Sequence, residues 1–471
     1  MTRIRVRIAV LALVLVCTGL VAAPALAAQG QFTTFEAPSE LLNGGDGSRI
    51  QALGELHALG VDSIRMTMFW QNVAPGADSR RAPRFVATDP AAYSWGAYGQ
   101  LADEVHARGM RLLVTVTGPV PRWATASGKD HLTNPSPADY KAFMTAVGRR
   151  FGADTYTFSV WNEPNLSKFL APQFARGGRA VSPGLYRRLF FAGYDGLRAA
   201  GVTAPVLAGE TAPVGNAITV APLRFLRGVL CLNASYRPSA RCARLPAAGW
   251  ATHPYMRPVF PTAPPPGPED VTIGGLGRLN RALDRAAAAG MVARRLPIYA
   301  TEFGVQSFPN LVAGVSLAHQ ADYRSVAEFL AYGNPRVVSF SQYLLTDAAP
   351  VPGPALGRYV YQMGLYLFKH HIAKPAYAAF RLPLVVRRHG GSVALWGLVR
   401  PARASHSVGS VTVSYADGGA NRWHPLLHAS FGSSGYWTAR STYRSGRHWR
   451  VSWTSPSGAT YTGPATAAYA F

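Results

Sequence analysis

Eight short β-rich runs, each followed by a longer segment of helical period, constrain this chain more than any other feature of its sequence. Strands that alternate with helices indicate βα units and a parallel sheet. Eight such units predict a closed (β/α)8 barrel. The runs are Phe32–Glu36, Ser63–Met68, Leu112–Thr117, Thr155–Trp161, Val206–Glu210, Gly249–Tyr255, Ile298–Glu302 and Val337–Leu344.

The segments between these runs carry start and stop signals for helices. Ser136 can cap a helix whose first turn holds Pro137. Helices are predicted over Ile50–Leu59, Trp95–Arg108 and Pro137–Phe151. Glycines suited to ending a helix stand just before the next strand at Gly60, Gly109, Gly152 and Gly201.

The pattern changes after Lys374-Pro375, where alternating strands follow one another without helical segments. This pattern predicts a small antiparallel β-sandwich. The predicted strands are Ser392–Trp396, Ser410–Tyr415, Gly435–Ala439 and His448–Thr454. We therefore divide the chain into a leader (1–27), a barrel (28–379) and a β-sandwich domain (380–471). A packing support for the barrel is the favoured role of the last domain, and a carbohydrate-binding module is the alternative.

The amino end has the features of a secretory signal peptide. Arg3, Arg5 and Arg7 precede an apolar run from Ile8 to Ala23, and small residues follow at 25–27. The apolar run is shorter than the roughly 20 residues of a spanning helix. We expect an exported protein that is secreted or associated with the cell envelope.

The mature chain is strongly basic. Three of the 47 Lys and Arg residues lie in the leader, so 44 remain against 23 Asp and Glu, a net charge of about +21. The arginines are scattered, without zinc-finger or basic-helix patterns, which argues against a nucleic-acid partner. An acidic glycan or the cell envelope fits this charge better. A glycan is the expected partner of a monomeric protein.

Two cysteines remain after processing, Cys231 and Cys242, in a segment with prolines and turn formers. In an oxidising compartment such a pair is expected to form a disulfide.

Two carboxylates stand at strand ends, where barrels of this type place their active sites. The fourth run ends in the sequence WNEPN, which contains Glu163, and the seventh ends in TEFG, which contains Glu302. These strands face each other across a barrel, so both side chains are expected to point into one cleft.

The two motifs resemble those of glycoside hydrolase clan A, which includes the cellulase-like family 5 and the xylosidase-like family 39. The resemblance extends to Arg65 on the second run and to the His253-Pro254-Tyr255 segment on the sixth, and it covers roughly residues 32–379. It implies a retaining hydrolase with Glu163 as general acid/base and Glu302 as nucleophile.

Chemistry suggests roles for the neighbouring residues. Arg65 and the Tyr255 hydroxyl can keep Glu302 ionised by donating to it. Asn162 can donate to the sugar 2-hydroxyl. Two assignments have structural alternatives, because Arg65 could instead pair with a buried acid and His253 could be a satisfied core histidine rather than a substrate contact.

Several further residues are candidates for lining the cleft. Trp70, Trp123 and Trp161 follow strand ends, where aromatic faces can stack on sugar rings, although core packing is equally expected for each. The eighth run has Tyr343 where many clan members carry a tryptophan platform. Glu36 and Glu210 also end strands, without a motif around them.

The predicted function is cleavage of O-glycosidic bonds in a polysaccharide or oligosaccharide by double displacement. A transglycosylase, a non-catalytic glycan-binding protein and a structural envelope protein are the alternatives. No metal-ligand spacing or phosphate-binding loop is present in the sequence, and no cofactor is implied.

Overall fold

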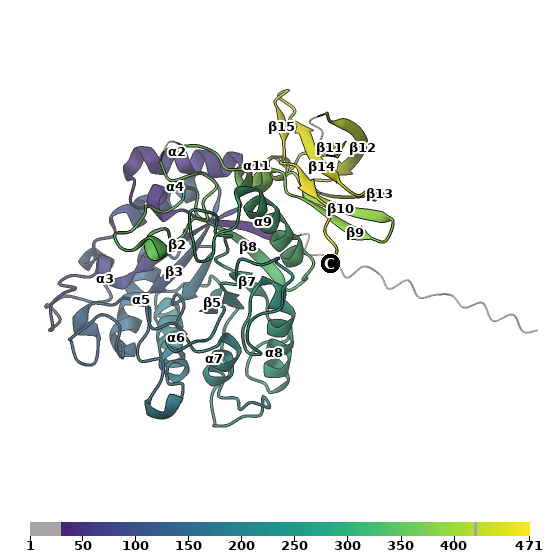
Figure 1. Ribbon diagram of the computed structural model, residues 1–471. Helices are drawn as coiled ribbons and strands as arrows, with labels where there is room; N and C mark the ends of the chain where they lie inside the picture. Colours follow the sequence, from purple (N-terminus) through teal and green to yellow (C-terminus); the bar gives the residue numbers. More distant parts are fainter. Residues whose placement is uncertain (1–29, 370, 419–421) are drawn as a thin grey trace, which may run out of the picture.

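The computed structural model describes residues 30–369, 371–418 and 422–471, so the expected signal peptide lies outside the described residues. Eight parallel strands form a closed barrel in sequence order, which confirms the predicted fold class (Figure 1). The strands are β1 (Phe32–Glu36), β2 (Ser63–Phe69), β3 (Arg111–Thr117), β4 (Thr157–Val160), β5 (Val206–Thr211), β6 (Gly249–Thr252), β7 (Ile298–Ala300) and β8 (Val337–Tyr343). Pairing of β1 with β8, with Thr34 opposite Ser341, closes the barrel.

The inside of the barrel is filled in layers. Its lowest layer is an apolar cluster, to which alternate strands contribute Phe32, Leu113, Leu207 and Tyr299. Layers built from alternate strands are the usual packing of such a barrel. This apolar cluster fills the interior toward the amino-terminal ends of the strands, whereas Glu163 and Glu302 follow the carboxyl ends of β4 and β7.

Helices surround the barrel and cover its outer face (Figure 1). They are α1 (Pro38–Leu41), α2 (Gly45–Ala58), α3 (Trp70–Val73), α4 (Gly96–Ala107), α5 (Pro137–Phe151), α6 (Ser182–Ala199), α7 (Pro222–Val229), α8 (Leu276–Ala288), α9 (Leu317–Tyr332), α10 (Ala355–Arg358), α11 (Pro375–Arg381) and α12 (Arg400–Ala404). Short 3-10 turns are η1 (Pro90–Ala92), η2 (Arg122–Ala124), η3 (Arg176–Gly178) and η4 (Ile273–Gly275). Within the described residues, no helix combines the length and apolar character needed to cross a membrane.

The predicted helix signals work as expected at most sites. Ser136 caps α5 by accepting from the Asp139 N–H at 3.3 Å. Gly60, Gly109 and Gly201 have φ of 79°, 67° and 79°, the left-handed conformation that ends a helix. Gly152 differs, because it keeps a helical φ of −62°.

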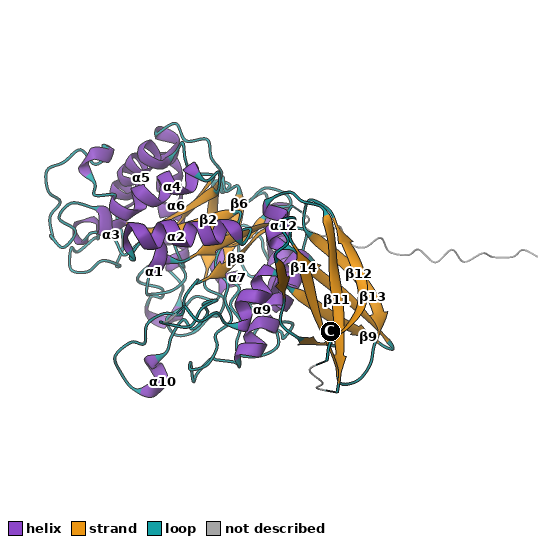
Figure 2. Ribbon diagram, turned by 90° about the horizontal axis from the view of Figure 1, so that it is seen from above, coloured by secondary structure: helices purple, strands orange, loops and turns teal. Residues whose placement is uncertain are grey.

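The carboxyl-terminal domain consists of two antiparallel sheets around their own apolar core, which confirms the predicted β-sandwich (Figure 2). One sheet has the order β13-β10-β9, and the other has the order β12-β11-β14-β15 with β16 beside β14. The strands are β9 (Leu384–His389), β10 (Ser392–Leu398), β11 (Gly409–Asp417), β12 (His424–Phe431), β13 (Tyr436–Thr442), β14 (Arg447–Thr454), β15 (Thr460–Thr462) and β16 (Thr466–Ala467). The domain boundary predicted at residue 379 falls within α11.

The β-sandwich packs against α9 of the barrel through an apolar cluster. Val326 of α9 is buried with Val385 and Trp396 of the β-sandwich. Beside this cluster, the buried guanidinium of Arg400 pairs with Glu328 of α9. This continuous interface fits the support role favoured for the domain.

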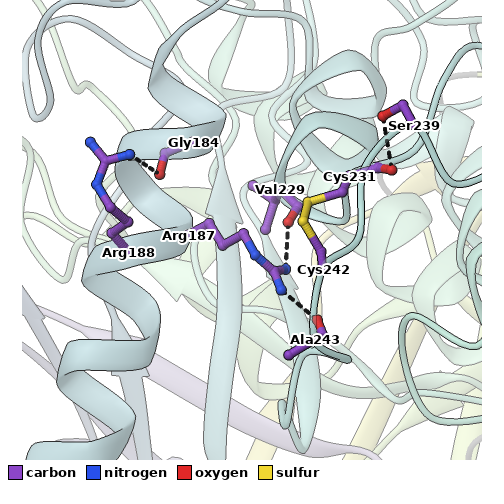
Figure 3. Close-up of a disulfide and its surroundings, with 8 residues drawn as sticks. All are labelled: Gly184, Arg187, Arg188, Val229, Cys231, Ser239, Cys242 and Ala243. Atoms are coloured by element: carbon purple, nitrogen blue, oxygen red, sulfur yellow. Dashed lines mark hydrogen bonds between the residues drawn. A yellow bond between two sulfur atoms is a disulfide. The ribbon is translucent and has the colours of Figure 1, made fainter.

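A disulfide joins Cys231 and Cys242, as predicted, with their Cα atoms 6.3 Å apart (Figure 3). It closes the segment after α7. Arg187 of α6 reaches this segment and donates to the Val229 carbonyl at 2.8 Å and to the Ala243 carbonyl. The disulfide segment is thereby attached to the helical layer outside the barrel.

Candidate active site

Glu163 and Glu302 both lie just beyond the carboxyl ends of their strands. β4 ends at Val160 and β7 at Ala300, so each carboxylate belongs to the first residues of a loop. Trp161 and Glu163 have φ of 73° and 38°, a left-handed conformation that is costly for side chains of this size. Such strained backbone is concentrated at functional sites, where the surrounding structure enforces it.

The loop after β4 is held in this conformation by buried hydrogen bonds. The Glu163 N–H donates to the Glu210 carbonyl at 3.0 Å. Asn165, which is fully buried, donates to the carbonyls of Ala212 and Val220 at 3.0 and 2.9 Å and accepts from the Ala212 N–H at 2.8 Å. Asn165, the last residue of the WNEPN motif, therefore connects the loop carrying Glu163 to the loop after β5.

Glu302 is surrounded by donors. Arg65 Nη1 donates to its Oε1 at 2.6 Å, and the Tyr255 hydroxyl donates to its Oε2 at 2.9 Å. Burial raises the pKa of Glu302, but the charges of His253 and Arg65, with these hydrogen bonds, outweigh burial and leave the pKa below its usual value. Glu302 is thus held as a carboxylate, the form that a nucleophile requires.

His253 lies between the two carboxylates. Its Nδ1 is 3.0 Å from Glu163 Oε1 and 3.5 Å from Glu302 Oε2, so these two oxygens are at most about 6.5 Å apart, the sum of the two distances. The ring is fully buried, which lowers its pKa, but Glu302 and Glu163 raise the pKa above its usual value. Among the described residues, no side chain or backbone group hydrogen-bonds its Nε2. The histidine thus belongs to the site and is not a satisfied core residue.

Arg65 forms the floor of the site. Besides Glu302, its guanidinium contacts Glu36 and donates through Nη2 to Glu210 and to Asn162 Oδ1, both at 2.7 Å. Both arrangements considered for Arg65 are present, because one guanidinium pairs with the buried acids Glu36 and Glu210 and also donates to Glu302. Since Arg65 fixes the Asn162 carbonyl oxygen, the amide nitrogen of Asn162 is oriented as a donor.

Glu36 and Glu210 belong to this floor and not to the open part of the cleft. Both are buried, at 6% and 0% exposure. Burial raises the pKa of Glu36 to about 7 even though Arg65 opposes the shift. Glu36 is therefore the carboxyl group of the floor that can carry a proton near neutral pH.

Two threonines complete the floor, and sequence reasoning missed them. Thr67 donates to Glu36 at 2.8 Å, and Thr115 accepts from Arg65 Nε at 3.2 Å while donating to Glu210 at 2.8 Å. A signal for them exists, because Thr67 follows Arg65 by two residues and so faces the same side of its strand. A polar residue on the inward face near a strand end marks the floor of such a site.

Two of the aromatic candidates, Trp70 and Trp161, are unavailable to a ligand, so of the two alternatives considered for them core packing holds and sugar stacking does not. Trp70 is fully buried and stacks on Phe143 at 5.0 Å between ring centroids. Trp161 is also fully buried and donates its indole N–H to the Phe169 carbonyl at 3.0 Å. Both rings fill space between the barrel and α5, so core packing explains them.

The other two aromatic candidates are half-buried. Trp123 lies edge-on to Trp70 at 5.7 Å and donates to the Pro75 carbonyl at 3.1 Å, in the wall formed by the loops after β2 and β3. Tyr343, at the end of β8, lies near Glu302 and Glu36, and burial and these carboxylates together raise its pKa well above the usual value. The structure thus brings Tyr343 near Glu302 and Glu36 and leaves Trp123 in the wall.

Comparison with known proteins was made at the level of sequence and of structure. No protein-family model matches the chain, and no curated protein matches it. Among solved structures, a family 39 glycoside hydrolase from Bacteroides cellulosilyticus is similar over 90% of this chain and 82% of its own, with a TM-score of 0.52 and 14% identity. A glucosidase from Croceicoccus marinus is similar over 91% of this chain and 96% of its own, with a TM-score of 0.54 and 9% identity.

At these identities the likeness concerns the fold. Each similarity spans nearly all of the chain, so it includes the β-sandwich as well as the barrel. The chain therefore shares the barrel fold of known glycoside hydrolases, in agreement with the resemblance of its motifs to clan A.

Proposed function

We propose that the chain is an exported retaining glycoside hydrolase that cleaves O-glycosidic bonds in a polysaccharide or oligosaccharide. The observation that carries the proposal is the pair Glu163 and Glu302, which share His253 and whose facing oxygens, Oε1 of Glu163 and Oε2 of Glu302, lie at most about 6.5 Å apart. Retaining enzymes space these groups by about 5–5.5 Å, whereas inverting enzymes need about 6.5–9.5 Å to admit a water molecule. The spacing favours retention.

In the first step, Glu302 attacks the anomeric carbon and Glu163 gives its proton to the departing glycosidic oxygen. The fixed contacts of Glu302 with Arg65 and Tyr255 orient its oxygens before substrate binds. A covalent glycosyl-enzyme results, and the departing chain leaves with the proton of Glu163.

In the second step, Glu163 removes a proton from water, which attacks the anomeric carbon and releases Glu302. His253 Nδ1 lies 3.0 Å from Glu163 Oε1 and, as a donor, can stabilise the carboxylate form of Glu163 that activates water in this step. Asn162, oriented by Arg65, donates to the 2-hydroxyl of the reacting sugar, a contact that strengthens in the transition state.

The test distinguishes the roles of the two carboxylates by using substrates whose leaving groups differ in their need for a proton. Glu163→Ala should lose nearly all turnover on natural glycans, yet still form the glycosyl-enzyme from a dinitrophenyl glycoside, whose phenolate departs without a proton. The intermediate should then accumulate, and azide should relieve the block by entering the vacated space. Glu302→Ala should be inactive on both substrates.

The measurements are dinitrophenolate release from a panel of glycosides and the mass of the trapped protein. A 2-deoxy-2-fluoro glycosyl fluoride of the accepted sugar should label a peptide containing Glu302. If Glu163→Ala lost both activities equally and Glu302→Ala kept the activated one, the two roles would be reversed. Binding of glycans without release of any aryl group would instead indicate a non-catalytic glycan-binding protein.

A further inference from the structure

Two loops beside the candidate active site form one structural unit, which we call the lip and define as residues 305–316, 345–369 and 371–374. The first follows β7 and the second follows β8. The Gln362 N–H donates to Gln306 Oε1 at 2.8 Å, and the Ser307 N–H donates to the Gln362 carbonyl at 3.0 Å. These bonds hold the two loops side by side.

A buried lysine connects the two loops of the lip. Lys374 Nζ donates to Asp347 Oδ1 at 2.6 Å and to Ser307 Oγ at 3.0 Å, and the Lys374 side chain has no exposed surface. The Asp347 carboxylate also accepts from the Gly364 N–H at 2.8 Å. Because the buried Lys374 pairs with Asp347 of the second loop and also donates to Ser307 of the first, the outer side chains of the lip are presented on a fixed frame.

The outer surface of the lip is apolar. Eight of the fourteen exposed large apolar side chains in the described part of the chain lie on it. The most exposed of the eight are Leu311, Val312 and Leu356, at 60%, 64% and 65%. Single exposed apolar residues need no explanation, but their concentration on two adjoining loops marks an interaction surface.

The exposed charges of the lip itself are positive, and two half-buried carboxylates, Glu40 and Glu55, contact it at Thr346 and Tyr366. The only acidic residue within the lip is Asp347, which is buried against Lys374. Arg358 and Lys369 are exposed on the lip, and Lys168, from the loop after β4, has its ammonium 5.9 Å from the centre of the Tyr361 ring. The lip therefore combines apolar side chains with cations and lacks an exposed carboxylate.

The lip adjoins the candidate active site. The ring of Tyr361 on the lip lies edge-on to Tyr343, with centroids 6.0 Å apart, and Tyr343 lies near Glu302. Figure 2 shows α10, which carries Leu356 and Arg358, projecting from the body of the barrel. A flat partner that met this projection would also meet the edge of the cleft.

We propose that the lip docks on the surface of a lipid bilayer that contains anionic headgroups. Apolar side chains enter the boundary between headgroups and acyl chains, while neighbouring cations pair with anionic headgroups, and the lip offers both. A second copy of the chain fits less well, because a lip-to-lip contact would bring like charges together in a mature chain whose net charge is about +21. Docking would place the cleft at glycosides held on the membrane.

The experiment is co-sedimentation of the mature protein with vesicles of phosphatidylcholine alone or mixed with phosphatidylglycerol. The test variant is L311S/V312S/L356S, which removes apolar surface without changing charge. The control is I50S/V408S, which removes two exposed apolar side chains outside the lip. We expect binding to the mixed vesicles, a loss of at least tenfold in the lip variant, and a change below twofold in the control.

Equal binding by the lip variant and the parent would overturn the proposal, as would an absence of binding to the mixed vesicles. A dimer in sedimentation equilibrium that the lip variant abolishes would assign the lip to a second copy instead. The result is independent of the proposed hydrolase activity, because vesicle binding needs no turnover. Release of dinitrophenolate from a soluble glycoside should stay within twofold in the lip variant.

Discussion

At the scale of single residues, the site depends on one arginine shared by three carboxylates. Arg65 contacts Glu36, Glu210 and Glu302, and its side chain is fully buried. A buried charge is tolerated only when it is paired and hydrogen-bonded, so these groups depend on one another. Because Arg65 serves three acids, a change in the charge of one acid alters the field at the others.

Glu36 should make the protein less stable as the pH rises. Its pKa is about 7 in the folded state against 4.5 ordinarily, so the folded state binds the extra proton between these values. Stability then falls as pH rises through this interval. From pH 4.5 to 7.5, the free energy of unfolding of the parent should fall by up to about 3 kcal/mol more than that of Glu36→Gln. Urea unfolding at the two pH values measures this difference.

A second variant checks the cause. Thr67→Val removes the hydroxyl that donates to Glu36, so the pKa of Glu36 should rise and the loss of stability should extend to higher pH. Parallel stability curves for the parent and Glu36→Gln would show that Glu36 does not exchange a proton in this range.

At the scale of elements, the sequence predicts the strands well and their last residues less well. The predicted fourth and seventh strands run to Trp161 and Glu302, but β4 and β7 end at Val160 and Ala300. At β4 the reason is the backbone, because Trp161 turns to a φ of 73°. The apolar pattern of a strand cannot reveal such a turn, because contacts with neighbouring loops impose the turn. The hydrogen bonds of Asn165 to the loop after β5 are an example.

Four strands of the β-sandwich, β9, β12, β15 and β16, were not predicted, and β9, β12 and β15 each lie at the end of the strand order of their sheet. β12 starts with His424-Pro425 and is largely exposed, so it lacks the alternation of a half-buried strand. Proline is tolerated at such an edge because its missing N–H is not needed there. Similarly, Trp70 and Trp161 are buried because their rings pack against side chains of α5. Their positions just after strand ends do not reveal this contact.

The disulfide should stabilise the segment after α7 without affecting the site. A loop of this size removes roughly 3 kcal/mol of unfolded-state entropy, so C231S/C242S should lose about that much stability. The control S239A removes one hydrogen bond to the Cys231 carbonyl and should cost about 1 kcal/mol or less. Thermal and urea unfolding measure both. Two titratable thiols in the denatured, non-reduced parent would contradict the disulfide.

At the scale of the whole molecule, a chain of buried contacts leads from the β-sandwich to the barrel. Arg400 of α12 pairs with Glu328 of α9, which also accepts from Arg324 at 2.5 Å. Arg324 in turn donates to Gln342 Oε1 at 2.9 Å, on β8, next to Tyr343 in the site. The β-sandwich thus supports the helix behind the strand that borders the cleft, which favours a structural role over a separate binding module.

If the β-sandwich supports the barrel in this way, substitutions of two arginines in α12 should differ greatly in their cost to stability. Arg400→Met removes a fully buried cation and leaves Glu328 with one partner fewer, so it should cost about 3–5 kcal/mol of stability. Arg403→Met removes a partly exposed cation 3.4 Å from Asp62 and should cost less than about 1 kcal/mol. Urea unfolding compares the variants, with dinitrophenolate release measured below the unfolding transition. Because Glu328 and Arg324 connect Arg400 to β8, turnover should fall in Arg400→Met and stay near the parent value in Arg403→Met. Equal stability of the two variants would show that the buried pair does not couple the β-sandwich to the barrel.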